Sequence, residues 1–130
     1  MPLLDTVVLF AAADPSDTKH EKAVKYMQEL KKEKFYIASF AYLEFDIILK
    51  SRGFNPTERM EIHALMIKEF PYAKLHPLSP ATMYLTARIE REYNLDYFDA
   101  GVAAEALQHD GVVISTDKAF EKVNGIKRVW

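Results

Sequence analysis

The chain has 130 residues, of which 49% are hydrophobic and 28% are charged, and its formal net charge is −2. This length suits one domain, 1–130, that buries roughly two-thirds of the surface of its unfolded chain. The lack of cysteine excludes disulfides and thiolate metal sites and is typical of a reducing cytosol, while the weak net charge excludes a protein that binds nucleic acid through a broadly basic surface.

The N-terminal segment, MPLLDTVVLFAAAD, contains a short apolar run that Asp5 interrupts, and it has no basic leader. Such a segment makes a poor signal peptide. No apolar run reaches the roughly 18 residues that suggest a membrane span. We therefore expect a cytoplasmic protein without a membrane partner.

Strands and helices alternate in the first half of the chain. Short apolar runs predict two strands, at 1–5 and 35–38. Between them, 7–13 predicts an apolar turn or short helix. Apolar residues at helical spacing then predict a helix that Asp17 or Thr18 caps and that runs to about Lys34. A further helix follows over 41–51, with Ser39 as the expected N-cap.

The second half continues the alternation. Asn55, Pro56 and the apolar spacing after them predict a helix that ends before Pro71. The segment 73–78 reads as an edge strand, because Pro77 cannot donate to a ladder. The remaining predicted elements are helices over 80–92, 98–109 and 117–122 and strands over 112–115 and 126–129. Alternating strands and helices indicate a three-layer α/β/α fold with a central, mainly parallel sheet of four to five strands.

Four carboxylates fall at special places in this pattern: Asp5 ends the first strand, Glu44 lies in an otherwise apolar helix, Asp99 begins a helix and Asp117 ends a strand. Open α/β folds bind ligands outside the carboxyl ends of their strands. Carboxylate and water oxygens are the ligands that Mg²⁺ and Mn²⁺ prefer. Four converging acids therefore predict one or two hydrated cations.

A structural interpretation stands beside this one. Each of the three aspartates precedes a helical stretch, and aspartate is a favoured N-cap. Glu44 is harder to explain in this way, since a glutamate among apolar residues is rarely buried without a partner. Asp96 lies in the loop before Asp99 and is read as an outer-shell or solvated acid. Asp46 is read as structural, paired with Lys50 at i, i+4.

The acids lie in four segments, in order LLDTVVLF, SFAYLEFDIILK, YFDAGVAAEAL and VVISTDKAF. Over nearly its whole length the chain resembles the PIN-domain ribonucleases, in the small single-domain branch of the VapC-type toxins of toxin–antitoxin pairs. The resemblance implies a metal-dependent endoribonuclease that holds Mg²⁺ or Mn²⁺ with Asp5, Glu44, Asp99 and Asp117. It also implies that Thr116 or Ser115 fills a hydroxyl position near the last acid.

The resemblance further implies partners. VapC-type toxins cleave RNA, form homodimers, and bind an antitoxin that commonly occludes the active cleft with a basic side chain. The helices between 17 and 69 carry residues that are able to form a groove for such a peptide, namely Tyr26, Tyr36, Tyr42, Phe54 and Met60. Lys19, His20 and Lys22 start the first long helix, and a solvated charged face is favoured there over contact with a phosphate backbone.

Val7 departs from the family pattern, which often has Asn or Ser after Asp-Thr to orient the first acid or its waters. Thr6 is kept, and its hydroxyl is able to take over part of that role. Val7 favours the alternative of a catalytically silent PIN-like module that binds RNA or a partner chain. A receiver-type phosphoryl switch is disfavoured, because it requires an acidic pair after the first strand, where this chain has the single Asp5.

Overall fold

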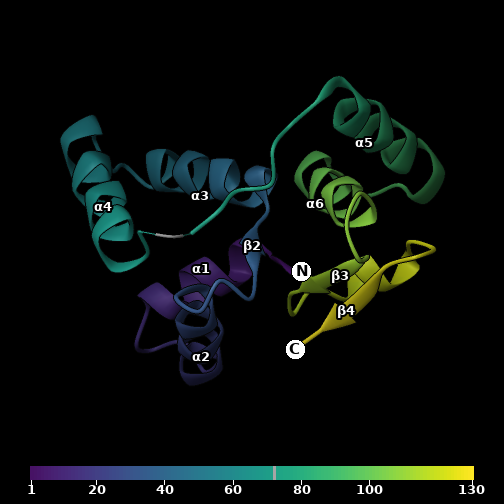
Figure 1. Ribbon diagram of the computed structural model, residues 1–130. Helices are drawn as coiled ribbons and strands as arrows, with labels where there is room; N and C mark the ends of the chain where they lie inside the picture. The colour runs from purple at the N-terminus through teal and green to yellow at the C-terminus, as the bar shows by residue number, and fades with distance from the viewer. Residues whose placement is uncertain (72) are drawn as a thin grey trace.

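A computed structural model describes residues 1–71 and 73–130 (Figure 1). A parallel sheet of four strands, in the order β2-β1-β3-β4, lies at its centre. The strands are β1 (Leu3–Leu4), β2 (Tyr36–Ile37), β3 (Val112–Ile114) and β4 (Lys127–Val129). The predicted parallel sheet is therefore confirmed.

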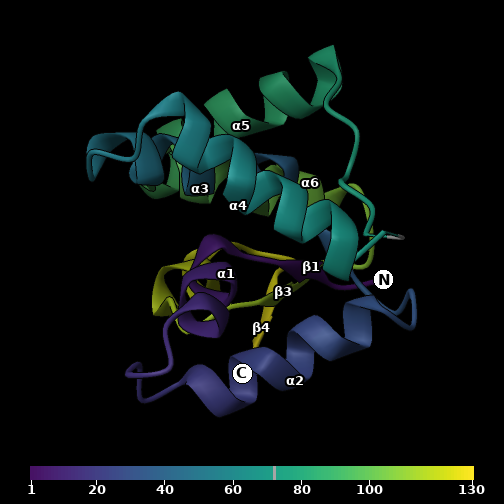
Figure 2. The same ribbon diagram turned by 90° about the vertical axis from the view of Figure 1, so that its left-hand side faces the viewer.

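Helices cover both sides of the sheet. They are α1 (Thr6–Ala13), α2 (His20–Leu30), α3 (Ser39–Ser51), α4 (Pro56–Glu69), α5 (Pro80–Tyr93), α6 (Tyr97–Leu107) and the short 3₁₀ helix η1 (Lys118–Lys122). Figures 1 and 2 show α2 on one side of the sheet and α6 on the other, with α5 outside α6. This is the predicted α/β/α arrangement. Among the described helices, none has the length and apolar character that crossing a membrane requires.

Alternation along each strand divides the core in two. Leu3 and Val113 face the cluster that α6 completes, whereas Leu4 and Ile114 face the cluster that α1 and α2 complete. All four side chains are at most 1% exposed. Burial of each contributes about 1.5–3 kcal/mol, so short strands are held firmly at the centre of the fold.

The predicted edge strand at 73–78 is reduced to a single bridge. Leu75 pairs in parallel with Ile37, and its neighbours complete the link through Ile37 N–H to Lys74 O (2.9 Å) and His76 N–H to Ile37 O (3.1 Å). Pro77 ends this pairing because it has no N–H to donate.

Neither Asp17 nor Thr18 caps the first long helix, which begins at His20 after Lys19, because the residues before it form turns. The Asp14 carboxylate accepts from Ser16 N–H at 2.9 Å, and the Asp17 carboxylate accepts from Lys19 N–H at 2.8 Å. Such local side-chain bonds compete with helix formation.

A distant carboxylate begins α3. The predicted N-cap, Ser39, is instead the first residue of the helix, and Ala38 precedes it without a side-chain cap. The fully buried Glu105 of α6 accepts from Ser39 N–H at 2.8 Å and from Phe40 N–H at 3.2 Å. Burial raises the pKa of Glu105 to about 7, although both hydrogen bonds act to lower it.

Helices α3 and α6 approach closely beside this cap. A Cβ atom on Gly101 would lie 2.3 Å from the ring of Phe40, so no larger residue fits there without a shift of α3. Helix α3 carries Glu44 and α6 carries Asp99. The distance between the two helices at this contact therefore fixes the distance between the backbone positions of these two acids.

Candidate active site

Two of the predicted acids lie at the carboxyl edge of neighbouring parallel strands. Asp5 directly follows β1, and its N–H donates to Ile114 O of β3 at 3.1 Å. Asp117 follows β3 after a two-residue turn. This edge is where α/β folds of this kind bind ligands.

Asp5 is nearly inaccessible to water, with 3% of its surface exposed. One carboxylate oxygen accepts from the Ser115 hydroxyl at 2.8 Å. Burial raises the pKa of Asp5 to about 6, against the lowering effect of hydrogen bonds from Ser115 and the Thr6 amide, and the charges of Glu44 and Asp117 raise it further. Although Asp5 stands at the N-cap position of α1, its side chain makes no capping bond, so a cap does not explain it.

Asp99 lies in the first turn of α6, and Asp96 caps that helix. The Asp96 carboxylate accepts from Asp99 N–H at 2.9 Å, which gives the exposed Asp96 a structural role in the turn. Burial raises the pKa of Asp99 to about 8, and the charges of Asp96, Asp5 and Asp117 add to this increase. The capping interpretation is therefore wrong for Asp99.

Glu44 is half-buried on α3, on the same side as these acids. Burial raises its pKa, the neighbouring Thr6 hydroxyl lowers it, and the charge of Asp96 raises it. The same hydroxyl donates to Ala41 O at 3.2 Å. Thr6, the first residue of α1, thus connects α1 to α3 through this bond.

Asp117 does serve as a cap, because one of its oxygens accepts from Ala119 N–H of η1 at 2.9 Å. Its own N–H donates to the Ser115 hydroxyl oxygen at 3.0 Å. Of the two predicted hydroxyl residues, Ser115 therefore connects Asp117 to Asp5. Thr116 is half-buried beside them and lines a cavity that contains Thr6 and Glu44.

These acids repel one another without a compensating cation from the protein. Within 1–71 and 73–130, no salt bridge involves Asp5, Glu44, Asp96, Asp99 or Asp117. Like charges in a buried site raise one another's pKa and disfavour the folded, ionised state. A bound cation would remove that cost.

The chemistry of this donor set fits Mg²⁺ or Mn²⁺, because every donor is a hard oxygen. The described residues, however, contain no group of three or more His, Asp or Glu side chains at metal-ligand spacing. A cation that keeps several of its own waters suits such an open set, since waters fill the remaining coordination positions.

Two side-chain interactions differ from the sequence interpretation. Asp46 pairs with the neighbouring helix instead of Lys50: it accepts from His63 Nε2 at 2.7 Å and lies 3.3 Å from Arg59 Nε. Glu105 was not identified at all, although a lone glutamate inside the apolar run AGVAAEAL was a usable signal of a buried, partnered acid.

Comparison with known proteins gives the family. The model of the PIN domain family matches residues 3–126. The chain therefore belongs to the PIN domain family, as its sequence segments predicted. Proteins of this family are generally nucleases that use divalent metal ions. Comparison with curated protein sequences yields no match.

Solved structures share the fold. A FitAcB structure from Neisseria gonorrhoeae matches with a TM-score of 0.71 and 19% identity, over 98% of this chain and 96% of that chain. VapBC2 from Rickettsia felis, bound to a DNA fragment from its promoter, matches with a TM-score of 0.72 and 12% identity, over 98% of this chain and 96% of that chain. PAE2754 from Pyrobaculum aerophilum matches with a TM-score of 0.63 and 22% identity, over 97% of this chain and 88% of that chain. At these identities the likeness is one of fold.

Proposed function

We propose that this protein is a metal-dependent endoribonuclease of the VapC type, the toxin of a toxin–antitoxin pair. One observation carries the proposal: Asp5 and Asp99, with pKa values raised to about 6 and about 8, lie among further acids, and within 1–71 and 73–130 no salt bridge balances them. A protein maintains such a costly arrangement where the charge is used. Membership of the PIN family favours phosphodiester hydrolysis over other reactions that a bound cation supports.

In this proposal Asp5, Glu44, Asp99 and Asp117 hold Mg²⁺ or Mn²⁺. The cation, when bound, supplies a water of lowered pKa and offsets the charge that develops on a phosphoryl oxygen. Ser115 fixes the orientation of Asp5 through its 2.8 Å hydrogen bond. Thr6 and Thr116 line the cavity that contains Glu44, and Asp96 borders the site.

Cleavage of single-stranded RNA with and without Mn²⁺ tests the proposal. Asp5→Asn and Asp99→Asn should each abolish Mn²⁺-dependent cleavage in protein that still folds. Glu92→Gln is a matched control, because Glu92 is an exposed carboxylate on α5 that pairs with Arg88. Cleavage that survives both aspartate substitutions would exclude this site as its source.

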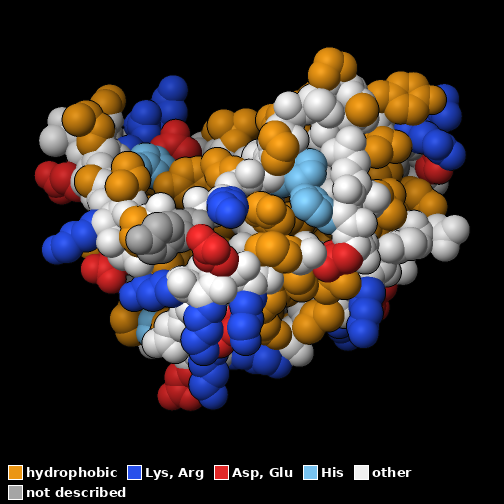
Figure 3. Space-filling view, in the orientation of Figure 1, with side chains coloured by type: hydrophobic (Ala, Val, Ile, Leu, Met, Phe, Trp, Pro, Cys, Tyr) orange, Lys and Arg blue, Asp and Glu red, His pale blue; other side chains and the backbone are white. Residues whose placement is uncertain are grey.

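An antitoxin is the proposed partner, and α4 is its proposed docking surface. None of the 14 residues of α4 is buried, and Met60, Leu65 and Ile67 are 70%, 58% and 71% exposed. Figure 3 shows hydrophobic side chains over α4 and α3. Two structures of similar fold are named for FitAB and VapBC2, each bound to DNA. This likeness, together with the predicted resemblance to VapC-type toxins, supports an antitoxin in preference to other partners.

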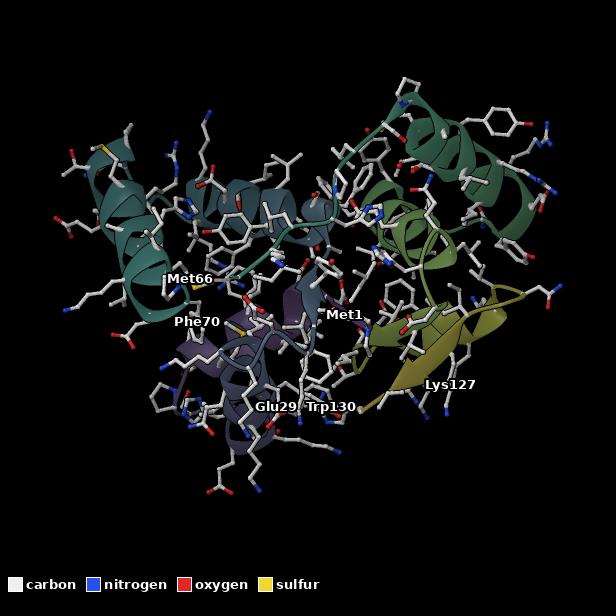
Figure 4. The ribbon with its side chains drawn as sticks, viewed as in Figure 1. Met1, Glu29, Met66, Phe70, Lys127 and Trp130 are labelled. Carbon is white, nitrogen blue, oxygen red and sulfur yellow. The ribbon has the colours of Figure 1, made fainter. Side chains whose placement is uncertain are left out.

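Two apolar cavities flank α4 and offer room for a peptide. One of about 570 Å³ lies between α3 and α4, lined by Tyr42 among others, and one of about 300 Å³ lies between α2 and α4. Met66 and Phe70, at the end of α4, line both (Figure 4). An amphipathic helix would place its apolar face along such a groove.

Co-purification tests this docking surface. The product of an adjacent antitoxin gene should be retained by the wild-type protein and lost by Leu65→Glu and Ile67→Glu, with RNA cleavage unchanged in both. Retention by both variants would place the antitoxin elsewhere. The homodimer remains a proposal from the resemblance, and sedimentation equilibrium decides it.

A catalytically silent PIN-like module is the second candidate, favoured by Val7 beside Thr6. Calorimetric titration with Mn²⁺ separates it from the nuclease. A silent module should show no Mn²⁺ binding that Asp5→Asn or Asp99→Asn removes.

A further inference from the structure

A groove leads away from the acids at the carboxyl edge of the sheet. It is a cavity of about 280 Å³ formed by α1, α3, the turn after β3, the segment before α2 and the last residue of the chain. Thr6, Glu44 and Thr116 line it, so it opens at the candidate active site. Most of the rest of its lining is apolar, aromatic or cationic, and one further acid, Asp17, lies in it beside Lys19: the residues are Val7, Phe10, Ala11, Asp17, Lys19, Ile48, Arg52 and Trp130. We call it the α1–α3 groove.

The chemical character of this groove changes along α3. Glu44, Ile48 and Arg52 are four residues apart and therefore lie on one face of the helix, about one turn from each other. Thr6 and Phe10 follow the same spacing on α1, which packs against α3. Along α3 the groove thus passes from acidic through apolar to cationic with distance from the acids, while Asp17 lies beside Lys19 in the segment before α2.

Arg52 is held in place and has donors to spare. Its Cζ lies 4.8 Å from the centroid of the Phe10 ring, a cation–π contact that orients the guanidinium. Arg52 is exposed and makes no ion pair with any residue of 1–71 or 73–130. Lys19, also exposed, likewise pairs with no carboxylate in those residues. Guanidinium donors in this state suit a phosphate.

Trp130 supplies an aromatic wall. It packs beside α2 (Figure 4), with its ring 5.4 Å from that of Tyr26 and 5.5 Å from Lys22 Nζ, and it also lines the groove. A half-buried indole fixed by such neighbours is a platform on which a base is able to stack. Cations beside aromatic side chains are the usual means of holding single-stranded nucleic acid without a sequence requirement.

We propose that the α1–α3 groove binds the nucleotide that flanks the cleaved bond of a single-stranded RNA. The base enters between Val7, Ile48 and Trp130, and its phosphate meets Arg52 and Lys19. This inference rests on the proposed endoribonuclease function, because the acids at the inner end of the groove then hold the neighbouring, scissile phosphate. The acid-to-apolar-to-cationic order matches successive phosphate, base and phosphate along one strand.

Binding is measured with a labelled RNA hexamer of mixed sequence in the presence of EDTA, because a nuclease that depends on a divalent cation does not cleave it there. Arg52→Met and Trp130→Leu should each weaken binding about tenfold. The slope of log Kd against log salt concentration should fall by about 0.7 in Arg52→Met only, because that variant loses one phosphate contact. Arg91→Met, on the remote helix α5, is the matched control and should bind as the wild type does. Since Trp130 is the sole tryptophan, quenching of its emission by the hexamer reports this groove directly.

Cleavage kinetics sharpen the test. Both variants should raise KM about tenfold and leave kcat within about twofold, because uniform binding is lost. An abasic nucleotide beside the cleaved bond should impair the wild type and have little further effect on Trp130→Leu. Arg52→Met keeps the test sound if Trp130→Leu fails to fold, since Arg52 is an exposed side chain at the end of α3.

The two proposals fail in different ways. Unchanged KM and Kd in both variants, with cleavage still abolished by Asp5→Asn, would overturn the groove and leave the nuclease standing. A wild type that cleaves no RNA would overturn the nuclease. The hexamer titration would then still decide the groove, because unchanged Kd and unquenched Trp130 emission would exclude it.

Discussion

Seven consecutive residues of α6, from Ala100 to Ala106, are buried, whereas α4 is longer and buries none of its residues. Small side chains allow α6 to lie between the sheet and α5, close enough for Gly101 to meet the Phe40 ring. Helix α4 exposes Met60, Leu65 and Ile67 instead. An apolar surface of this kind usually marks an interaction site.

The difference between α6 and α4 corresponds to two requirements of the proposed function, a rigid active site and an accessible docking surface. The acids beside α6 need fixed positions, and buried packing supplies them. A docking surface needs apolar side chains that remain accessible until a partner covers them. Substitutions in α6 should therefore change the folding free energy, while those in α4 should change association. Five predictions test this contrast.

Glu105→Ala should produce the largest loss of stability. It removes the acceptor of the buried Phe40 N–H and of the part-buried Ser39 N–H, which costs about 3 kcal/mol of unfolding free energy. Urea denaturation measures the change. Glu105→Gln is the matched control and should recover part of the loss, since its carbonyl oxygen still accepts one bond. A loss below about 1 kcal/mol in Glu105→Ala would contradict this cap's importance.

Gly101→Ala should follow, at about 1–3 kcal/mol, because its methyl group would overlap the Phe40 ring and push α3 from α6. Ala103→Gly, on the same helix, serves as a comparison in which only helix propensity and a methyl group change. Thermal unfolding of both proteins, followed by circular dichroism, measures the difference. Equal melting temperatures for wild type and Gly101→Ala would show that the contact is loose.

Asp99→Asn should stabilise the metal-free protein by about 1 kcal/mol or more at pH 8. Because the folded pKa of Asp99 is raised to about 8, the folded state holds a proton that the unfolded state releases near pH 4. Stability therefore falls as pH rises from about 4 to about 8. The substitution should flatten that decline, and urea denaturation at pH 5 and pH 8 without metal measures it. An equally steep decline in Asp99→Asn would assign the effect to other groups.

The raised pKa values of Asp5 and Asp99 also affect metal binding. Asp5 and Asp99 must lose their protons to hold a cation, so Mn²⁺ affinity should weaken as pH falls from about 8 to about 6. Calorimetric titration at both pH values measures this. Affinity that is independent of pH would mean that neither acid takes part.

Ile67→Ser should change the unfolding free energy least, within about 0.5 kcal/mol, because the side chain is 71% exposed. The same variant should bind the antitoxin measurably more weakly. A large loss of stability would show that α4 contributes to the core and would erase the contrast with α6.

Local pattern was sufficient for much of the fold. The alternation of apolar runs and helical periods predicted the parallel sheet, and strand ends located Asp5 and Asp117. Pattern failed where a residue's partner lies far away in the chain. Ser39 was read as a cap although Glu105, 66 positions later, performs that role. Asp46 was given a helix neighbour although its partners lie on α4.

The sequence alone determined the order of elements, because hydrophobic period is a local property, and the resemblance of its four acidic segments indicated the family and the four candidate acids. Tertiary structure decided the rest: that Asp96 rather than Asp99 caps α6, that Ser115 links Asp5 to Asp117, and that burial raises pKa values at this edge. Burial and long-range hydrogen bonds depend on which distant surfaces meet, and no local window of sequence contains that information.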